Sequence, residues 1–105
     1  IIGGVCHGVL GLIKALDKNG NLLIAGRNMT GVTDKQITEL GITLTPMHPE
    51  SELRKAGVNF ESKTAFRDIF ATHVTVDIEK RFVTGQNQNS GLEAAHKIIE
   101  LLASQ

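Results

Sequence analysis

The pentapeptide Gly4-Val5-Cys6-His7-Gly8 stands between two apolar runs, and it constrains the fold of this chain more than any other feature. The run before it, 1–5 (IIGGV), is typical of a short parallel strand buried on both faces. The run after it, 9–16 (VLGLIKAL), predicts a buried helix. A strand, a sharp turn and a helix, with glycines two residues to either side of a cysteine, form the layout of a nucleophile elbow.

This layout predicts that Cys6 is a nucleophile. Side chains two residues before and after it would collide across such a turn, and Gly4 and Gly8 would avoid that collision. Cys6 would begin the following helix, where the helix dipole and unpaired N–H groups favour a thiolate. The N–H of His7 would then be placed to bind a developing oxyanion. The alternative is that Cys6 is a small, buried apolar residue.

A cysteine nucleophile also needs a base and a group that orients the base. His7 leaves the same turn, and we expect it to take one of these roles, with filling of the turn as the alternative. Asp34 is the first candidate for an acid that holds the imidazole, because it follows a strand end and begins a helix at the same rim. Glu39, one helical turn further on, is the second candidate. Asp34 can equally be an ordinary helix N-cap, and Thr33 is the other candidate for that cap.

The rest of the chain predicts an α/β pattern with a hairpin. We expect strands over residues 22–25, 27–32, 58–61, 73–78 and 81–84, with a tight turn at Glu79-Lys80 between the last two. We expect helices over 34–40, stopped by Gly41, over about 49–56, stopped by Gly57, and after Ser90.

The last helix carries two further expectations. Ser90 would cap it, with Glu93 at the capping-box offset. An apolar stripe is expected to face the core, formed by Leu92, Ala95, Ile98, Ile99 and Leu102. The four phenylalanines are expected in the core as well, at positions 60, 66, 70 and 82.

Composition excludes several classes of protein. Eleven Lys and Arg balance eleven Asp and Glu, and Trp and Tyr are absent, which argues against nucleic acid as a partner. No apolar run approaches the roughly eighteen residues of a membrane span. One cysteine excludes an internal disulfide and indicates a reducing compartment, which we take as the cytoplasm. No histidine pair has zinc-like spacing on a helix, so we expect no metal and no cofactor.

Four segments resemble the DJ-1/ThiJ/PfpI superfamily, whose fold is class I glutamine amidotransferase-like. They occur in the family's order, and the heat-shock chaperone and glyoxalase III branch is the most similar. Val5-Cys6-His7-Gly8 is similar to the family's A-V-C-H-G-P elbow, and Met29–Asp34 (MTGVTD) to its T-G-F-[ST]-D segment. The other two are Pro46–Leu53 (PMHPESEL), similar to P-F-L-L-E-D-E-L, and Thr84–Ser90 (TGQNQNS), similar to T-G-Q-N-P-x-S.

The resemblance implies a flavodoxin-like, doubly wound sandwich with a mainly parallel sheet. Residues 1–105 would be the C-terminal half of that single domain, which agrees with the abrupt apolar start at Ile1. The N-terminal half would be a partner that supplies further strands and a second oxyanion donor, and the protein is expected to form a homodimer. The Glu residues that usually follow Asp34 are replaced by Lys35-Gln36-Ile37, so the choice between Asp34 and Glu39 stays open.

The activity implied by the resemblance is a glutathione-independent glyoxalase, a lyase that converts methylglyoxal to D-lactate through Cys6. Hydrolysis of an amide or peptide, or hydration of an isonitrile, would use the same nucleophile. A non-enzymatic holding chaperone or a redox sensor is the alternative outside catalysis. We expect His48 and Asn87 at the rim of the substrate pocket, although a surface loop explains His48 as well. The loop with Asn87 and Asn89 is expected to lie beside the elbow.

Overall fold

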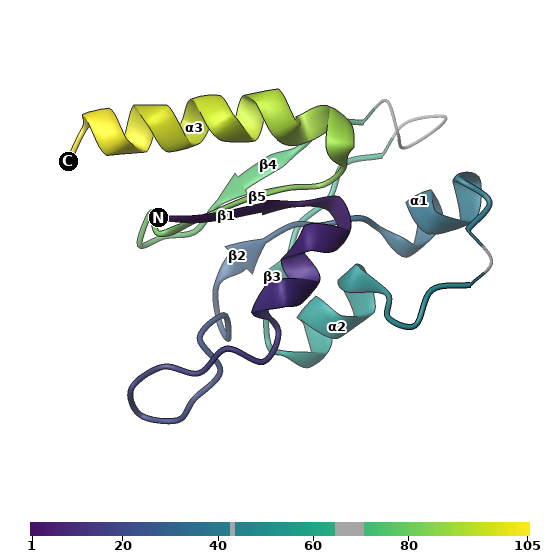
Figure 1. The fold of residues 1–105 in the computed structure, drawn as a ribbon, viewed down its shortest axis with the longest axis horizontal. Helices are drawn as coiled ribbons and strands as arrows, with labels where there is room; N and C mark the ends of the chain where they lie inside the picture. Colours follow the sequence, from purple (N-terminus) through teal and green to yellow (C-terminus); the bar gives the residue numbers. More distant parts are fainter. Residues whose placement is uncertain (43, 65–70) are drawn as a thin grey trace.

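A computed structural model describes residues 1–42, 44–64 and 71–105 (Figure 1). Its elements are β1 (Ile2–Val5), η1 (Cys6–Leu12), β2 (Asn28–Met29), α1 (Asp34–Glu39), α2 (Pro49–Lys55), β3 (Asn59–Phe60), β4 (Val74–Val76), β5 (Phe82–Gly85), η3 (Gln88–Ser90) and α3 (Gly91–Ala103). The chain therefore has the mixed α/β architecture that its pattern predicts. Among the described residues, no helix is long and apolar enough to cross a membrane.

The strands form two small sheets. The first has the order β1-β5-β4, with β1 parallel to β5 and β4 antiparallel to β5, so the predicted hairpin and the predicted parallel strand are both confirmed. In the second sheet, β2 lies parallel to β3. The strand expected over 22–25 is wrong, because the chain makes turns there, and the strand expected over 27–32 is reduced to β2.

Helices cover both sides of the strands, with α3 on one side and η1 and α2 on the other (Figure 1). The core is a cluster that includes the fully buried Val9, Met29 and Leu53, together with Phe82. Phe60 packs against this cluster from a partly buried position. The expectation for Phe66 and Phe70 lies outside the described residues.

The helix boundaries agree with the capping signals of the second third of the chain. Thr33 caps α1, because its Oγ1 accepts a hydrogen bond of 3.0 Å from the N–H of Gln36. Gly41 and Gly57, at the ends of α1 and α2, have φ angles of +72° and +88°. Only a glycine adopts such angles without strain, and this explains why both helices stop where the sequence predicts.

The two apolar runs around the elbow differ from the expectation. Residues 9–16 do not form a long buried helix; the structure has the 3-10 helix η1, and Leu16 is 60% exposed. Gly8 and Gly11 weaken a longer helix, and the Asp17 side chain fixes a turn directly after it by accepting from the N–H groups of Asn19 and Asn21. The strand is not buried on both faces either, because Ile2 and Gly3 are exposed and Gly4 and Val5 are only partly buried.

The stripe predicted on α3 is confirmed at Ile98 and is wrong at its other four positions, which are exposed. The face of α3 toward the sheet is formed by the buried Ala94 and the partly buried Ile98. Leu92, Ile99 and Leu102 are 72%, 63% and 53% exposed. The capping box is absent, since the Ser90 side chain caps nothing and bonds to the preceding loop instead. The helix therefore has an apolar outer face in addition to its packed one.

A buried ion pair fixes the hairpin to the rest of the chain. Nη1 of Arg27 lies 2.5 Å from Oδ2 of Asp77 and 2.8 Å from Oε1 of Glu79. Oδ1 of Asp77 accepts from the N–H groups of Arg81 and Phe82 at 2.7 and 2.8 Å. Burial alone would raise the pKa of Asp77, but these N–H groups and the Arg27 guanidinium hold it below its ordinary value.

We predict that Asp77→Asn lowers the free energy of unfolding of the complete protein by about 2–3 kcal/mol at neutral pH, because Arg27 loses its buried charged partner. The stabilisation exists only while the carboxylate is ionised. It is therefore present above about pH 4 and is lost as the pH falls through the lowered pKa of the folded state. Urea denaturation from neutral to acidic pH measures both effects.

The matched control is Glu79→Gln, which removes the exposed partner of Arg27 and should cost less than about 1 kcal/mol. The account of the ion pair is wrong if the two variants are equally stable. It is also wrong if the difference between Asp77→Asn and the unmodified protein does not shrink in acid.

Candidate active site

The backbone at Cys6 is strained. Cys6 directly follows β1 and has a φ angle of +55°, in the left-handed region that residues with a Cβ rarely adopt. Lys80, in the hairpin turn, is the other non-glycine residue with such an angle in the described part of the chain. This conformation costs about 1–3 kcal/mol and persists only where the surrounding structure enforces it. The sharp turn predicted at the cysteine is confirmed.

The sulfur of Cys6 is half-buried and has polar neighbours. Nδ1 of His7 lies 3.6 Å from Sγ, so the ring is within reach of the thiol proton, as predicted for a base or orienting group. Burial raises the pKa of the Cys6 thiol, against the opposing effect of hydrogen bonds from the N–H groups of His7 and Gln88. The N–H groups at the helix start act in the predicted direction, but burial of the sulfur has the larger effect.

The segment between β2 and α1 runs beside the elbow. The carbonyl oxygen of Cys6 accepts from the N–H of Val32 at 3.5 Å. Gly31 leaves no room for a side chain, because a Cβ there would lie 2.8 Å from Cγ2 of Val9 and 3.4 Å from the Cys6 carbonyl oxygen. The N–H of Thr30 donates to Oγ1 of Thr84 on β5 at 2.9 Å. The strand ends thus meet at one rim, as expected.

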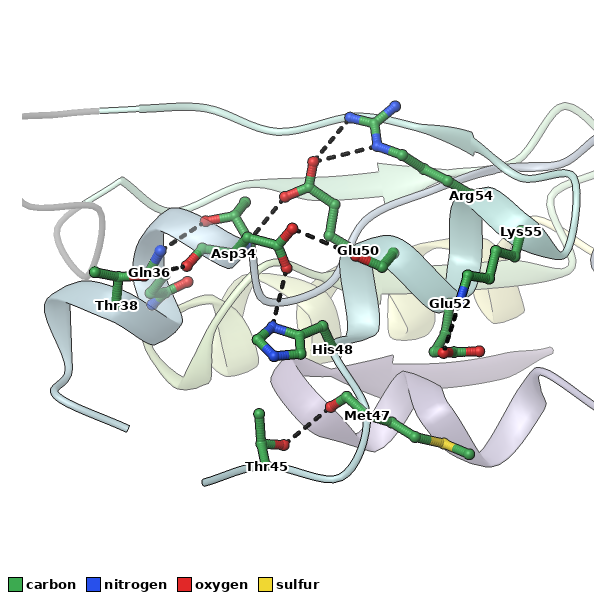
Figure 2. A network of polar contacts seen from close by, with 12 residues as sticks. Asp34, Gln36, Thr38, Thr45, Met47, His48, Glu50, Glu52, Arg54 and Lys55 are labelled. Atoms are coloured by element: carbon green, nitrogen blue, oxygen red, sulfur yellow. Dashed lines mark hydrogen bonds and ion pairs between the residues drawn. The ribbon is translucent and has the colours of Figure 1, made fainter. Parts of the chain in front are cut away.

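Asp34 contacts a different histidine from the one predicted. Figure 2 shows its carboxylate between His48 and Glu50, with Oδ1 3.2 Å from Nδ1 of His48. The N–H of Asp34 donates to Oε1 of Glu50 at 3.0 Å, and the Ser51 hydroxyl lies 3.4 Å from Oδ2. In the described part of the chain, the polar contact of the His7 ring is Cys6, and no carboxylate contacts it. Asp34 is not the N-cap either, since Thr33 has that role.

The other two predicted side chains lie in ordinary structural contacts. Glu39 pairs with Nζ of Lys35 at 3.5 Å at the end of α1. Asn87 is fully buried, and its Nδ2 donates to the carbonyl oxygen of Ala71 at 3.1 Å, so it anchors its loop instead of lining a pocket rim. His48 is about half-exposed on the linker before α2.

The steric reason given for Gly4 and Gly8 is wrong. A Cβ on Gly4 would make ordinary contacts of 3.6 Å or more with Val9, and a Cβ on Gly8 would have no atom within 4 Å. Both glycines have ordinary φ angles; the left-handed residue is Cys6 itself. The crowded glycines around the turn are Gly31 and Gly85, which are not neighbours of the cysteine in sequence.

Sequence reasoning missed two features of the site. One is the backbone of Gln88, which lowers the pKa of the Cys6 thiol from a loop distant in the sequence. The other is Gly85, where a Cβ would lie 2.7 Å from Cγ1 of Val5. The signal for both was the parallel pairing of β1 with β5, because their carboxyl ends must then lie side by side.

One cavity lies far from this chemistry. It has a volume of about 640 Å³ and lies at the amino ends of β1 and β5, and neither Cys6 nor His7 lines it. Ile1, Ile2 and Phe82 form its apolar part, and Arg27 and Arg81 contribute charge. Among the described residues, no group of three or more histidine, cysteine or acidic side chains could hold a metal ion.

No protein-family model and no curated protein matches this chain. Solved structures that are similar to it include the following two. The crystal structure of APC35852 has a TM-score of 0.86 and 33% sequence identity, over 99% of this chain and 45% of that protein. The X-ray structure of the 24 kDa rapid encystment protein (REP24) of Francisella tularensis has a TM-score of 0.85 and 30% sequence identity, over 97% of this chain and 43% of that protein. This chain therefore spans less than half the length of either protein.

We predict that Gly31→Ala destabilises the complete protein by roughly 1–3 kcal/mol, because the added Cβ must displace the buried side chain of Val9 beside the elbow. Gly8→Ala is the matched control. It adds the same atom into open space and should change stability by less than about 0.5 kcal/mol. Thermal unfolding of both variants measures the difference. A larger loss in Gly8→Ala would restore the original steric interpretation of the elbow.

Proposed function

We propose that this protein is a cysteine-dependent enzyme of the DJ-1/ThiJ/PfpI superfamily that acts on small reactive carbonyl compounds. The observation that carries the proposal is Cys6, held in a left-handed turn with its sulfur 3.6 Å from Nδ1 of His7. Strain of this kind at a cysteine with an adjacent base is typical of a nucleophile and is costly for a residue that only fills space.

The flavodoxin-like, doubly wound fold is part of the same proposal. It is supported by the parallel pairing of β1 with β5 and by helices on both sides of the strands (Figure 1). The two similar structures are more than twice as long as this chain, which fits a domain of which residues 1–105 are one half.

The raised pKa of Cys6 determines the first chemical step. Because the thiol is protonated at rest, we propose that His7 takes its proton as sulfur attacks the aldehyde carbon of methylglyoxal. A carbon–sulfur bond forms, and the electron pair of the C=O bond moves to oxygen, which is stabilised by the His7 N–H and then takes the proton from the imidazolium. The product of this step is a hemithioacetal.

The remaining steps return the enzyme to its starting form. His7 removes the proton from the hemithioacetal carbon and delivers it to the neighbouring carbon, while the proton of the hemithioacetal hydroxyl passes to the ketone oxygen through an enediol. The ketone thereby becomes an alcohol, and the first carbon becomes the carbonyl of a thioester. Water then hydrolyses the thioester, and Cys6 regains its proton. The sum is methylglyoxal plus water giving lactate, an internal redox change that needs no external oxidant, reductant or cofactor.

We predict that Cys6→Ala abolishes lactate formation from methylglyoxal in the complete protein. His7→Gln should reduce kcat by roughly 100-fold or more, since the proton transfers lose their base. His96→Gln, a change of the same type on the exposed face of α3, is the matched control and should have unchanged activity. Enzymatic measurement of D-lactate checks all three. Full activity in Cys6→Ala removes the proposal. Turnover of an amide or an isonitrile in place of methylglyoxal would assign the enzyme to another reaction class.

A holding chaperone is the second candidate function, and the exposed apolar face of α3 favours it. Leu92, Ile99 and Leu102 project from one side of that helix into solvent in this chain. Cys6→Ala separates the two functions, because a surface-based chaperone would still suppress aggregation of a client protein in that variant.

We propose that a preceding half of the same protein is the partner of this chain, in a protein that forms a homodimer. Within the described residues, one edge of β1 pairs with no other strand, and Ile1 and Ile2 are exposed beside the 640 Å³ cavity; both observations support such a partner. The greater length of both similar proteins supports it as well.

We predict that residues 1–105 expressed alone aggregate or are degraded, because apolar surface at β1 and α3 stays uncovered. Co-expression with the preceding half should give a soluble complex whose size indicates a dimer. Size-exclusion chromatography with light scattering and a thermal melt measure this. A monodisperse monomer of residues 1–105 with a cooperative melt would contradict the proposal.

A further inference from the structure

A buried hydrogen bond joins β5 to the segment that runs beside the elbow. The N–H of Thr30 donates to Oγ1 of Thr84 at 2.9 Å, and both residues are fully buried. Thr30 directly follows β2, so this bond connects the second sheet to the first. We infer that Thr84 is a positioning residue for the nucleophile, and that it acts through residues 30–32 on the peptide between Cys6 and His7. This inference rests on the proposed function, in which that peptide supplies the oxyanion donor.

Residues 30–32 contact the elbow at the carbonyl group of Cys6. The N–H of Val32 donates to this oxygen at 3.5 Å. A Cβ on Gly31 would lie 3.4 Å from the same oxygen and 2.8 Å from Cγ2 of Val9, so the segment lies directly against the turn. Val32 and Val9 are fully buried, and close packing on this side limits the positions that the Cys6 carbonyl can take.

The orientation of the Cys6 carbonyl determines the direction of the His7 N–H. The peptide that joins the two residues is planar and trans, so its C=O and N–H bonds point in opposite directions. Because the oxygen is turned toward Val32, the N–H of His7 is directed away from residues 30–32. The proposed mechanism uses this N–H for the developing oxyanion, and such a donor is effective when it is fixed before the reaction.

Thr84 is suited to hold residues 30–32 because its own position is fixed. It lies on the middle strand of the first sheet, opposite Gly4 on β1 and opposite Thr75 on β4. Its hydroxyl oxygen is the acceptor for a buried N–H, and leaving such a donor without a partner is costly. Loss of this oxygen should therefore displace Thr30 and the two residues after it.

The turn at Cys6 depends on this support. Its φ angle of +55° is costly and persists only where neighbouring segments enforce it. The same turn sets the distance of 3.6 Å between Sγ of Cys6 and Nδ1 of His7. A displaced segment 30–32 should therefore move both the oxyanion donor and the base relative to the sulfur, and small displacements of reacting groups slow catalysis strongly.

The test is the rate at which iodoacetamide alkylates Cys6 in the complete protein at pH 7, followed by peptide mass spectrometry, together with kcat and KM for lactate formation. Thr84→Val keeps the shape of the side chain but removes the acceptor. It should slow alkylation roughly three- to tenfold, and lower kcat roughly 10- to 100-fold with KM little changed. Thr84→Ser retains the hydroxyl and should restore both rates.

Thr75→Val is the matched control. It removes a buried hydroxyl from the residue opposite Thr84 on β4, and that hydroxyl bonds to Glu61 and His73. This change also costs stability, but it leaves the bond between Thr30 and Thr84 in place, so both rates should be unchanged.

Alkylation needs no substrate, so it separates this inference from the proposed function. Slowed alkylation in Thr84→Val that Thr84→Ser reverses supports the positioning role, even if methylglyoxal is not turned over and the proposed function fails. Unchanged alkylation in Thr84→Val, or an equal loss in Thr75→Val, overturns the inference, and turnover that depends on Cys6 would then leave the proposed function intact. If Thr84→Val melts below the assay temperature, Gly31→Ala replaces it with the same expected and contrary results, because its Cβ would press on the Cys6 carbonyl oxygen.

Discussion

The parallel pairing of β1 with β5 is the constraint on which the site depends. It places Val5 opposite Gly85, so the turn at Cys6 and the loop that begins at Gln86 leave the sheet at one edge. Two glycines far apart in sequence, Gly31 and Gly85, let the neighbouring segments approach that turn closely. The pairing therefore converts three separate stretches of chain into one environment around a single sulfur.

Burial and hydrogen bonding balance differently at the two ends of this sheet, so the pKa of Asp77 is lowered and the pKa of Cys6 is raised. At the hairpin end, Asp77 is buried but has Arg27 and two N–H groups, which outweigh burial and keep the carboxylate ionised. At the carboxyl end, N–H groups lower the pKa of Cys6 without help from a cation in the part of the chain that the structure describes, and burial prevails. The first arrangement suits a permanent structural ion pair. The second disfavours the charged form of the sulfur, and this is the starting point of the proton transfer to His7 that we propose.

The sequence predicted local features better than distant contacts. The turn at Cys6, the cap at Thr33 and the stops at Gly41 and Gly57 were predictable because each depends on a few adjacent residues. The pairing of Asp34 with His48 was not, because it depends on how α1 and α2 meet.

Two other failures have clear physical causes. The exposed face of α3 shows that apolar periodicity finds a helix but does not say which of two apolar faces packs on the sheet. The crowding of Gly85 shows that a close approach comes from the partner strand, which no local pattern reveals.

The measurement that tests the central claim most directly is alkylation of Cys6 in increasing urea, below the unfolding transition. We predict a rate that is constant across this range, because the sulfur reacts from the folded state. A rate that rises in proportion to the unfolded fraction would show a thiol sealed in the interior and would contradict the account.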